Sequence, residues 1–406
     1  MGKRVLVAMS GGVDSSVAAW LLQQQGYECV GVTMKLYQNE QVGRKGHTCC
    51  ALEDVEDARS VARRLGIQHY VFNFCETFDE QVMRKFADSY ERGDTPNPCI
   101  DCNRYLKFGY LFHRAQVLGM DYIATGHYAR IVQDPSTGRW ALEKAADPDR
   151  DQSYVLASMT QEQLSRTLFP LGGLHKPEVR KIAEEQGFCN ARKHDSQDIC
   201  FVPDGDYAAF LERYTGIQYP PGDILDREGH VLGRHKGAVR YTLGQRKGLG
   251  VSGPEPLYVC GKSMADNTVT VGPESALYGR ELLAEDWVWG AVPGLTGPTR
   301  VTAKVRYRQV EKAATAETAE NGAVRLTFDE PQRAITTGQA VVLYRGDTVL
   351  GGGTITTALY AWKSAPDRVR LLCRQSFRNT WTRKAMRVVR RSSAASRSAP
   401  ALGVFQ

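Results

Sequence analysis

The chain has 406 residues, too many for one ordinary hydrophobic core, and its 42% hydrophobic residues suffice for two or three folded domains. No run of 18 apolar residues occurs, and "MGKRVLVAMSGG" enters a strand at once, so we expect neither a membrane span nor a signal peptide. The net charge of the chain is +7. Residues 368–406 contain ten Lys or Arg and no Asp or Glu, so residues 1–367 have a net charge of −3. We therefore expect a soluble, cytoplasmic protein whose RNA binding, if any, depends on local patches.

The first half of the chain alternates short apolar strands with helical segments. A strand in "KRVLVAMSGG" precedes a helix in "DSSVAAWLLQQQGYE", and "CVGVTMKLY" predicts the second strand. The same order recurs in "VEDARSVARRLGI" with "QHYVFNF" and in "FGYLFHRAQVLGM" with "DYIATGH", before helices in "QEQLSRTLF" and "KPEVRKIAEEQGF". This alternation predicts an α/β domain with a parallel sheet that binds ligands at the carboxyl ends of its strands.

Beyond about residue 201 the chain becomes rich in glycine and in short alternating segments. These are "HVLGRHKGAVRYTLG", "LYVCGKS", "NTVTVG", "TRVTAKVRYRQV" and "AVRLTFDE". We expect an α/β catalytic domain over residues 1–200, a small β-rich domain over 201–273, a C-terminal β-barrel-like domain over 274–360 and a basic, largely disordered tail over 361–406.

The stretch "SGGVDSS" lies between the first strand and the first helix. Backbone N–H groups at a helix N-terminus favour a bound anion, and Gly11 and Gly12 let the backbone approach phosphate oxygens. Ser10, Ser15 and Ser16 add hydroxyl donors, whereas Asp14 is expected to bind Mg²⁺ or to fix the loop. The sequence differs from both a Walker loop and the Gly-x-Gly-x-x-Gly pattern.

The ten cysteines are scattered along the chain rather than arranged as the framework of a small secreted domain, so we expect most to be reduced. Two of them form the Cys-x-x-Cys pair of "NPCIDCN", Cys99 and Cys102. This spacing suits half of a metal site, a redox pair or a nucleophile, and spacing alone leaves all three open.

Several motifs together resemble those of a known family. "SGGVDSS" is similar to the loop of the ATP pyrophosphatase (PP-loop) enzymes, which adenylate a substrate oxygen and release pyrophosphate. "TPNPCIDCNRYLKFG", "ATGHYAR", "DQSYVL", "DSQDICF", "YTLGQRKGLG" and "GQAVVLY" resemble the tRNA-specific 2-thiouridylases (MnmA/TRMU type), in order over residues 1–357. Those enzymes replace the 2-oxygen of the wobble uridine of tRNA with sulfur.

The resemblance implies roles for individual residues of this chain. Cys102 is the nucleophile, Cys200 carries the persulfide sulfur, and the two close a disulfide when sulfur leaves. ATP, with Mg²⁺, is bound by the loop and two further residues: Ala8, Met9, Ser10, Gly11, Gly12, Val13, Asp14, Ser15, Met34 and Gly126. No protein-bound metal is expected, and the partners implied are tRNA, but not DNA, and a sulfur donor protein, either a cysteine desulfurase or a sulfur-relay protein.

Cys99 differs from the pattern of the family, in which many members carry an acidic residue at this position. Any acid–base role of that carboxylate therefore has no counterpart in this chain. A second possible mechanism uses Cys99, Cys102 and Cys200 as ligands of an iron–sulfur cluster, and we favour the persulfide. The ATP loop by itself would also suit a PP-loop ligase acting on a small molecule, and the basic residues by themselves would suit a non-enzymatic RNA-binding protein.

Contacts with tRNA are expected at three groups of residues. By resemblance, Asn97, Pro98 and Cys99 face the target base, and the remaining tRNA contacts are His127, Arg150, Asp151, Gln152, Arg306, Tyr307 and Gln339. Between Gly229 and Pro254 there are five basic residues and no acid, which suits phosphate binding: Arg234, Lys236, Arg240, Arg246 and Lys247. "KVRYR" at 304–308 interleaves charge with an aromatic ring, as an RNA-contacting strand does.

Overall fold

The computed structural model describes residues 2–38, 42, 50–194, 199–360 and 362. The chain divides into two compact units, residues 1–358 and 359–406. The helices and strands described below belong to the first unit, except for the last two residues of the final strand. "DSQD" at 195–198 and the basic tail lie outside the described residues. No helix among the described residues is long and apolar enough to cross a membrane.

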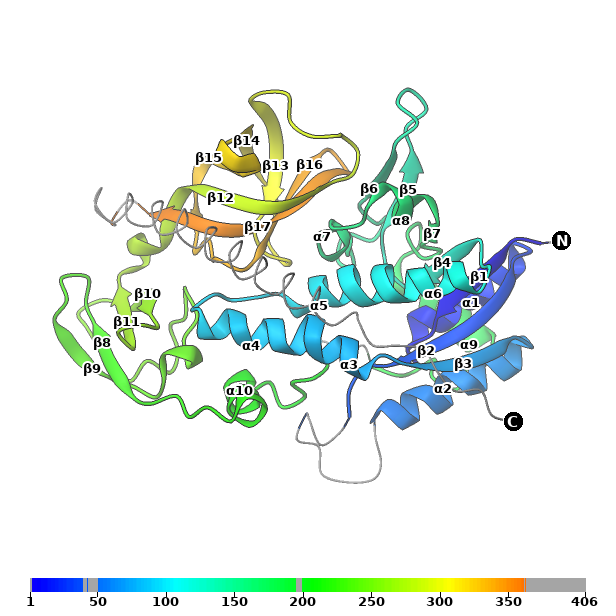
Figure 1. Ribbon diagram of the computed structural model, residues 1–406, viewed down its shortest axis with the longest axis horizontal. Coiled ribbons are helices and arrows are strands. Elements are labelled where there is room, and N and C mark those ends of the chain that lie inside the picture. The colour runs from blue at the N-terminus through cyan, green and yellow to red at the C-terminus, as the bar shows by residue number, and fades with distance from the viewer. Residues whose placement is uncertain (1, 39–41, 43–49, 195–198, 361, 363–406) are drawn as a thin grey trace, which may run out of the picture. The chain divides into compact units, whose positions relative to one another are not determined.

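The N-terminal part contains a five-stranded sheet in which all pairings are parallel, as the sequence predicted (Figure 1). Its order is β3-β2-β1-β4-β7, with bounds Gln68–Asn73, Glu28–Lys35, Arg4–Ala8, Tyr122–Thr125 and Thr167–Leu168. Because β2 and β4 lie on opposite sides of β1, the order reverses there, and the crevice at the carboxyl ends of β1 and β4 is the expected ligand position.

Alternate residues of β1 face two different cores. Val5 and Val7 pack with the helices α1 (Val13–Gln24), α2 (Cys50–Leu65) and α9 (Lys176–Glu185). Leu6 packs on the other face against residues of a long helical segment that ends in α6 (Phe112–Val117). This two-residue period buries the strand on both faces, as in other parallel sheets.

The remaining helices of this part are short or irregular. Their bounds are α3 Cys75–Phe78, π-helix η2 Asp79–Met83, α4 Arg84–Glu91, α5 Pro98–Asp101, π-helix η3 Cys102–Leu111, α7 Ser153–Leu156 and α8 Gln161–Ser165. The helix predicted through "QEQLSRTLF" was wrong at its end, because Thr167 and Leu168 leave α8 to pair with Ile123 and Ala124 of β4.

The central part forms a four-stranded sheet of order β10-β11-β8-β9. The strands are β8 Gly222–Leu225, β9 Val231–His235, β10 Tyr258–Ser263 and β11 Thr268–Gly272. The alternating segment predicted over 230–244 breaks at Gly237, whose φ of 108° precedes a short 3₁₀ helix, η4 (Ala238–Arg240). Helix α10 (Tyr207–Thr215), which the emphasis on strands missed, has an Asp206 N-cap and a left-handed Gly216 C-cap.

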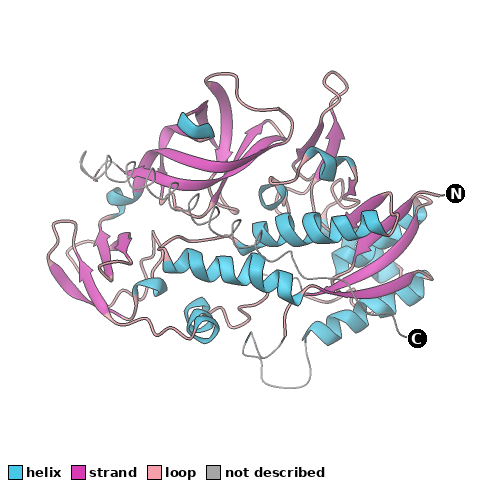
Figure 2. Ribbon diagram, viewed as in Figure 1, coloured by secondary structure: helices cyan, strands magenta, loops and turns pink. Residues whose placement is uncertain are grey.

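The C-terminal part contains a closed six-stranded barrel, since β12 pairs with both β15 and β17, in agreement with the barrel-like domain expected from the sequence (Figure 2). Its strands in barrel order are β12 Tyr278–Trp289, β15 Val324–Arg333, β14 Lys312–Thr318, β13 Thr299–Lys304, β16 Ala340–Arg345 and β17 Thr348–Tyr360. A hairpin of the N-terminal part, β5 (Arg130–Gln133) with β6 (Trp140–Glu143), extends this sheet through the Thr348–Glu143 pairing.

The interpretation of "KVRYR" as a strand was wrong. Strand β13 ends at Lys304, and residues 305–308 form a bend and a turn. Gln309 Oε1 accepts a hydrogen bond from the backbone N–H of Val305 at 3.1 Å, and the N–H of Gln309 donates to the carbonyl of Arg306 at 3.2 Å. These local bonds replace the ladder that a continuing strand would need.

Candidate functional site

The loop between β1 and α1 is held by its own serine hydroxyls. Ser15 Oγ accepts from the backbone N–H of Ser10 at 3.1 Å and donates to the carbonyl of Gly12 at 3.1 Å. Ser16 Oγ donates to the same carbonyl at 3.0 Å. The first N–H groups of a helix have no partner within the helix, so this loop presents backbone donors suited to an anion.

Two glycines of the site lie where a side chain would collide with backbone. Gly11 has a φ of 76°, and a Cβ there would overlap the backbone carbonyl of Asp54 in α2. A Cβ on Gly126, just beyond β4, would lie 2.6 Å from the backbone nitrogen of Ser15. The end of β4 therefore packs directly on the start of α1, at the point where the sheet order reverses.

Asp14 contacts two side chains from outside the loop, Lys176 and Tyr128. Lys176 Nζ lies 2.7 and 2.9 Å from its two carboxylate oxygens, and the Tyr128 hydroxyl donates to Oδ1 at 2.8 Å. Lys176 is buried, whereas the Asp14 side chain is partly exposed. Lys176 also donates its backbone N–H to Asp147, which ties the start of α9 to the segment around residue 147.

Asn190 and Lys193 make further contacts with the loop and with α2, which the sequence did not predict. Asn190 Nδ2 donates to the Gly11 carbonyl at 2.9 Å and lies 3.0 Å from Ser16 Oγ. Lys193 Nζ binds Asp54 at 2.7 Å and Asp57 at 2.6 Å in α2. No spacing rule links positions so distant in sequence, and only the fold brings them together.

The other residues expected at the nucleotide lie around the loop in different ways. Met9 and Val13 are buried in the core that α1 and α2 cover, and Ala8 ends β1. Met34 is half-buried near the end of β2, where it packs with the core on the opposite face of the sheet. The structure thus brings the loop and Gly126 together and places Met34 across the sheet from Val13.

The Cys-x-x-Cys pair begins a helix. Asn97 caps α5 by accepting from the backbone N–H of Cys99 at 3.2 Å, and Pro98 occupies the first helical turn. Cys99 is exposed in this turn, whereas Cys102 is half-buried at the start of η3. Both thiols are free.

Cys200 belongs to the same neighbourhood as this pair. Burial raises the pKa of its thiol to about 12, and the charges of Cys102 and Cys99 raise it further, although solvent reaches the residue. Burial likewise raises the pKa of Cys102, an effect that the ammonium of Lys107 opposes. The fold therefore gathers three thiols whose charges influence one another, two of them almost a hundred residues apart.

The barrel contacts both ends of residues 94–104, which we call the thiol segment. At its start, Gln339 Nε2 donates to the Thr95 carbonyl at 2.7 Å, and Thr337 Oγ1 donates to Asp94 at 2.7 Å. At its end, the guanidinium of Arg104 forms a two-pronged ion pair with Asp286. Gln339, expected at tRNA, is thus a link between the barrel and the thiol segment.

Of the residues expected at tRNA, Arg150 and Tyr307 are exposed. Tyr307 is 38% exposed, and its ring lies tilted against that of Tyr154, with the ring centroids 6.1 Å apart. Burial raises the pKa of Tyr307, to which Asp151 and Cys99 add, while Arg308 and Arg150 oppose it. Tyr307 thus lies close enough to both Cys99 and Arg150 for their charges to act on its hydroxyl.

The remaining residues expected at tRNA are bound within the protein. Asp151 is buried and accepts from Ser153 Oγ at 2.8 Å, and Gln152 Oε1 accepts from the Tyr128 N–H at 2.9 Å. His127 is buried against Phe108. Arg306 donates to the Ala334 carbonyl at 2.8 Å.

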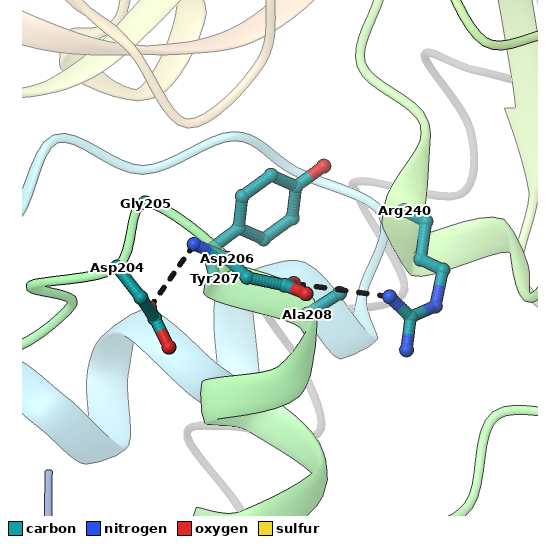
Figure 3. Close-up of a pocket in the computed structure, with 6 residues that line it drawn as sticks. All are labelled: Asp204, Gly205, Asp206, Tyr207, Ala208 and Arg240. Carbon is teal, nitrogen blue, oxygen red and sulfur yellow. Dashed lines mark hydrogen bonds and ion pairs between the residues drawn. The ribbon is translucent and has the colours of Figure 1, made fainter. Parts of the chain in front are cut away.

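The basic residues of the central part differ in their partners. Arg240 binds Glu212 at 2.8 Å and lies 3.8 Å from Asp206, in a shallow recess beside the start of α10 (Figure 3). Four others are exposed, and no ion pair involves them among the described residues: Arg234, Lys236, Arg246 and Lys247. Within the expected phosphate-binding strip, Arg240 thus differs from the other four side chains in having carboxylate partners.

Two groups of residues are possible metal ligands, Asp14 in the loop and the three thiols. Both carboxylate oxygens of Asp14 contact the Lys176 ammonium, which competes with a cation there. Within the described ranges, no three His, Cys, Asp or Glu side chains are grouped closely enough to hold a metal ion. Cys99, Cys102 and Cys200 as they stand thus do not form a cluster ligand set.

Three family models match the chain in succession. They are the tRNA methyl transferase HUP domain over residues 3–204, the tRNA methyl transferase PRC-barrel domain over 208–273, and the aminomethyltransferase beta-barrel domain over 279–355.

Curated relatives match over most of their length. The tRNA-specific 2-thiouridylase MnmA of Heliobacterium modesticaldum is 51% identical over 361 residues, 88% of this chain and 94% of the relative. Those of Symbiobacterium thermophilum and Clostridioides difficile are 52% and 47% identical over 88% of this chain, and over 93% and 99% of their own lengths. On this identity and coverage, the chain belongs to the family of tRNA-specific 2-thiouridylases of the MnmA type.

Proposed function

We propose that the protein is a tRNA-uridine 2-sulfurtransferase that uses ATP to replace the 2-oxygen of the wobble uridine with sulfur. The family membership supports the reaction class. The observation that carries the assignment to this chain is the meeting of Cys102 and Cys200, from distant segments, in a unit that also holds an anion-binding loop.

In the first step the uridine 2-oxygen attacks the α-phosphorus of ATP, and pyrophosphate leaves. The backbone donors of residues 11–15 stabilise negative charge on the phosphates, because they are fixed before the substrate binds. Gly126 keeps β4 close to the loop, and Lys176 neutralises Asp14, which otherwise repels phosphate. Mg²⁺ bound with ATP would offset negative charge on the phosphates as pyrophosphate leaves.

In the second step the outer sulfur of a Cys200 persulfide attacks C2 of the adenylated base, and AMP leaves with the former 2-oxygen. Cys102 then attacks Cys200 Sγ, so that the sulfur–sulfur bond breaks, the 2-thiouridine is released and a Cys102–Cys200 disulfide forms. A cellular thiol reduces that disulfide, and a sulfur donor protein reloads Cys200. The exposure of Cys200 suits such a delivery.

The target base must leave the anticodon stack to expose its 2-position. We propose that it enters beside Asn97, Pro98 and Cys99, with Arg150 and Tyr307 contacting the tRNA directly. The bound side chains then act by shaping this surface: His127, Asp151, Gln152, Arg306 and Gln339. The four exposed basic residues of the central part add phosphate contacts.

The test combines tRNA, ATP and a persulfide donor, with mass spectrometry of the tRNA nucleosides. We expect 2-thiouridine together with AMP and pyrophosphate that form only when tRNA is present. Cys200→Ser abolishes thiolation and retains tRNA binding, whereas Cys189→Ser, which removes another exposed thiol, retains both. Full activity of Cys200→Ser would refute the persulfide role.

The same assay separates the competing functions. A PP-loop ligase for a small molecule releases AMP without tRNA, and a non-enzymatic RNA-binding protein releases none. Iron and sulfide analysis of anaerobically purified protein tests the cluster mechanism, since stoichiometric iron that turnover requires contradicts the metal-free version.

A further inference from the structure

Lys107 lies on the same side of helix η3 as Cys102. In an α-helix the residue five positions further on is turned about 140° away. Residues 102–111 are instead a π-helix, whose i→i+5 hydrogen bonds bring residues five apart back toward one another. The unusual winding therefore directs Lys107 toward the thiol at the start of the helix.

Among the described residues, the Lys107 ammonium has one hydrogen-bond partner, a histidine, and no carboxylate partner. Its Nζ lies 3.3 Å from His127 Nε2, and no carboxylate of the described part of the chain lies within ion-pair distance of it. The side chain is half-buried. A partly desolvated ammonium is costly unless an anion compensates it, and no carboxylate in the described ranges does so, which suggests that Lys107 serves an anionic group of the site.

His127 holds the ammonium in place. Burial and the Lys107 charge keep the pKa of this histidine well below its ordinary value, so the ring is neutral. An ammonium only donates, hence Nε2 accepts, and the ring proton is on Nδ1, which lies 2.6 Å from Thr125 Oγ1. Phe108 and Phe169 pack on the ring and fix its plane.

The Lys107 charge acts on all three thiols of the site. It lowers the pKa of Cys99, of Cys102 and of Cys200, in each case against the larger effect of burial. Lys85, which lies over the Tyr105 ring at 3.5 Å, acts instead on Asp101. Lys107 is thus the basic side chain common to the three thiols.

We propose that Lys107 supplies the positive charge of the sulfur site, where its ammonium stabilises anionic sulfur at Cys99, Cys102 and Cys200, and that His127 is the residue that positions it. The role in turnover depends on the function proposed above. The positive charge itself does not, so it is measured without ATP or tRNA.

The test compares alkylation by anionic iodoacetate and neutral iodoacetamide, followed thiol by thiol with peptide mass spectrometry. The ratio of the two rates reports the local charge. We expect Lys107→Met and Lys107→Gln to lower this ratio at the three thiols by roughly 3- to 10-fold, the effect of one charge several ångströms away. Lys107→Arg keeps the ratio, and His127→Ala lowers it partly. The glutamine variant retains a donor to His127, which guards against a folding defect.

Two controls are built into the chain. Lys85→Met removes a neighbouring lysine and leaves the ratio unchanged, and the exposed Cys189 serves as an internal reference in every sample. An unchanged ratio in both neutral variants, or an equal loss in Lys85→Met, overturns the proposal. If the ratio falls while the parent protein thiolates no tRNA, the charge assignment stands and the proposed function fails.

Discussion

At the scale of single residues, buried charge sets the properties of the thiol segment. Asp101 lies between the two cysteines, and burial raises its pKa to about 6, while Lys85 and Arg104 oppose that rise and Asp286 adds to it. Its ordinary pKa is near 3.9, so ionisation of this carboxyl is harder in the folded protein than in the unfolded chain. The carboxyl thus favours folding most strongly below about pH 4, and this contribution is lost as the pH rises through 6.

Asp101→Asn should therefore stabilise the protein at pH 8 more than at pH 5, by roughly 1 to 3 kcal/mol, because asparagine never ionises. Urea unfolding at the two pH values measures the difference. Asp329→Asn is the control: its ion pair with Arg300 lowers the pKa of Asp329, so that variant gains no stability over the same interval. An equal effect of Asp101→Asn at both pH values would contradict the prediction.

At the scale of elements, the nucleotide loop depends on how closely β4 approaches α1. Backbone atoms of Asp14 and Ser15 lie 2.7 and 2.6 Å from the position that a Cβ of residue 126 would occupy. The backbone at the start of α1 would have to move to make space for it. The sequence placed Gly126 at the nucleotide by resemblance. The structure adds a physical reason for glycine there, which is the contact between two elements.

Gly126→Ala is expected to push the start of α1 from β4. We predict at least a 10-fold weaker binding of ATP, measured by calorimetry, and a loss of roughly 1 to 3 kcal/mol in the free energy of unfolding. Gly173→Ala is the matched control, since a Cβ there meets no atom within 4 Å. Parent-like ATP binding and stability in Gly126→Ala would show that the contact is relaxed in solution.

At the scale of the whole first unit, the barrel holds the thiol segment at both ends, through Thr337 and Gln339 at one end and Asp286 at the other. A small segment carrying two thiols is thereby fixed by strands more than 180 residues away. In the proposed mechanism the barrel therefore contributes to the sulfur site, because it holds the segment that carries Cys99 and Cys102.

Asp286→Asn should loosen the end of this segment. Arg104 is partly exposed, so the pair contributes only about 0.5 to 1 kcal/mol, and we expect a 2- to 5-fold faster amide exchange over residues 94–104. Asp329→Asn removes a carboxylate of similar geometry from Arg300 on the barrel, and it should leave this exchange unchanged. Equal amide exchange over residues 94–104 in the two variants would contradict this prediction.

The sequence by itself determined the parallel sheet, the barrel and the family, because strand and helix periodicities and a phosphate loop are local patterns. Helix α10 was not predicted, although Asp206 caps its N-terminus. "KVRYR" was predicted as a strand, whereas β13 ends at Lys304 and local hydrogen bonds form a turn there. Only the tertiary structure decided which distant side chains meet. Lys176 at Asp14, Asn190 at Gly11 and Lys107 at His127 are contacts between separate elements, and no spacing along the chain encodes them.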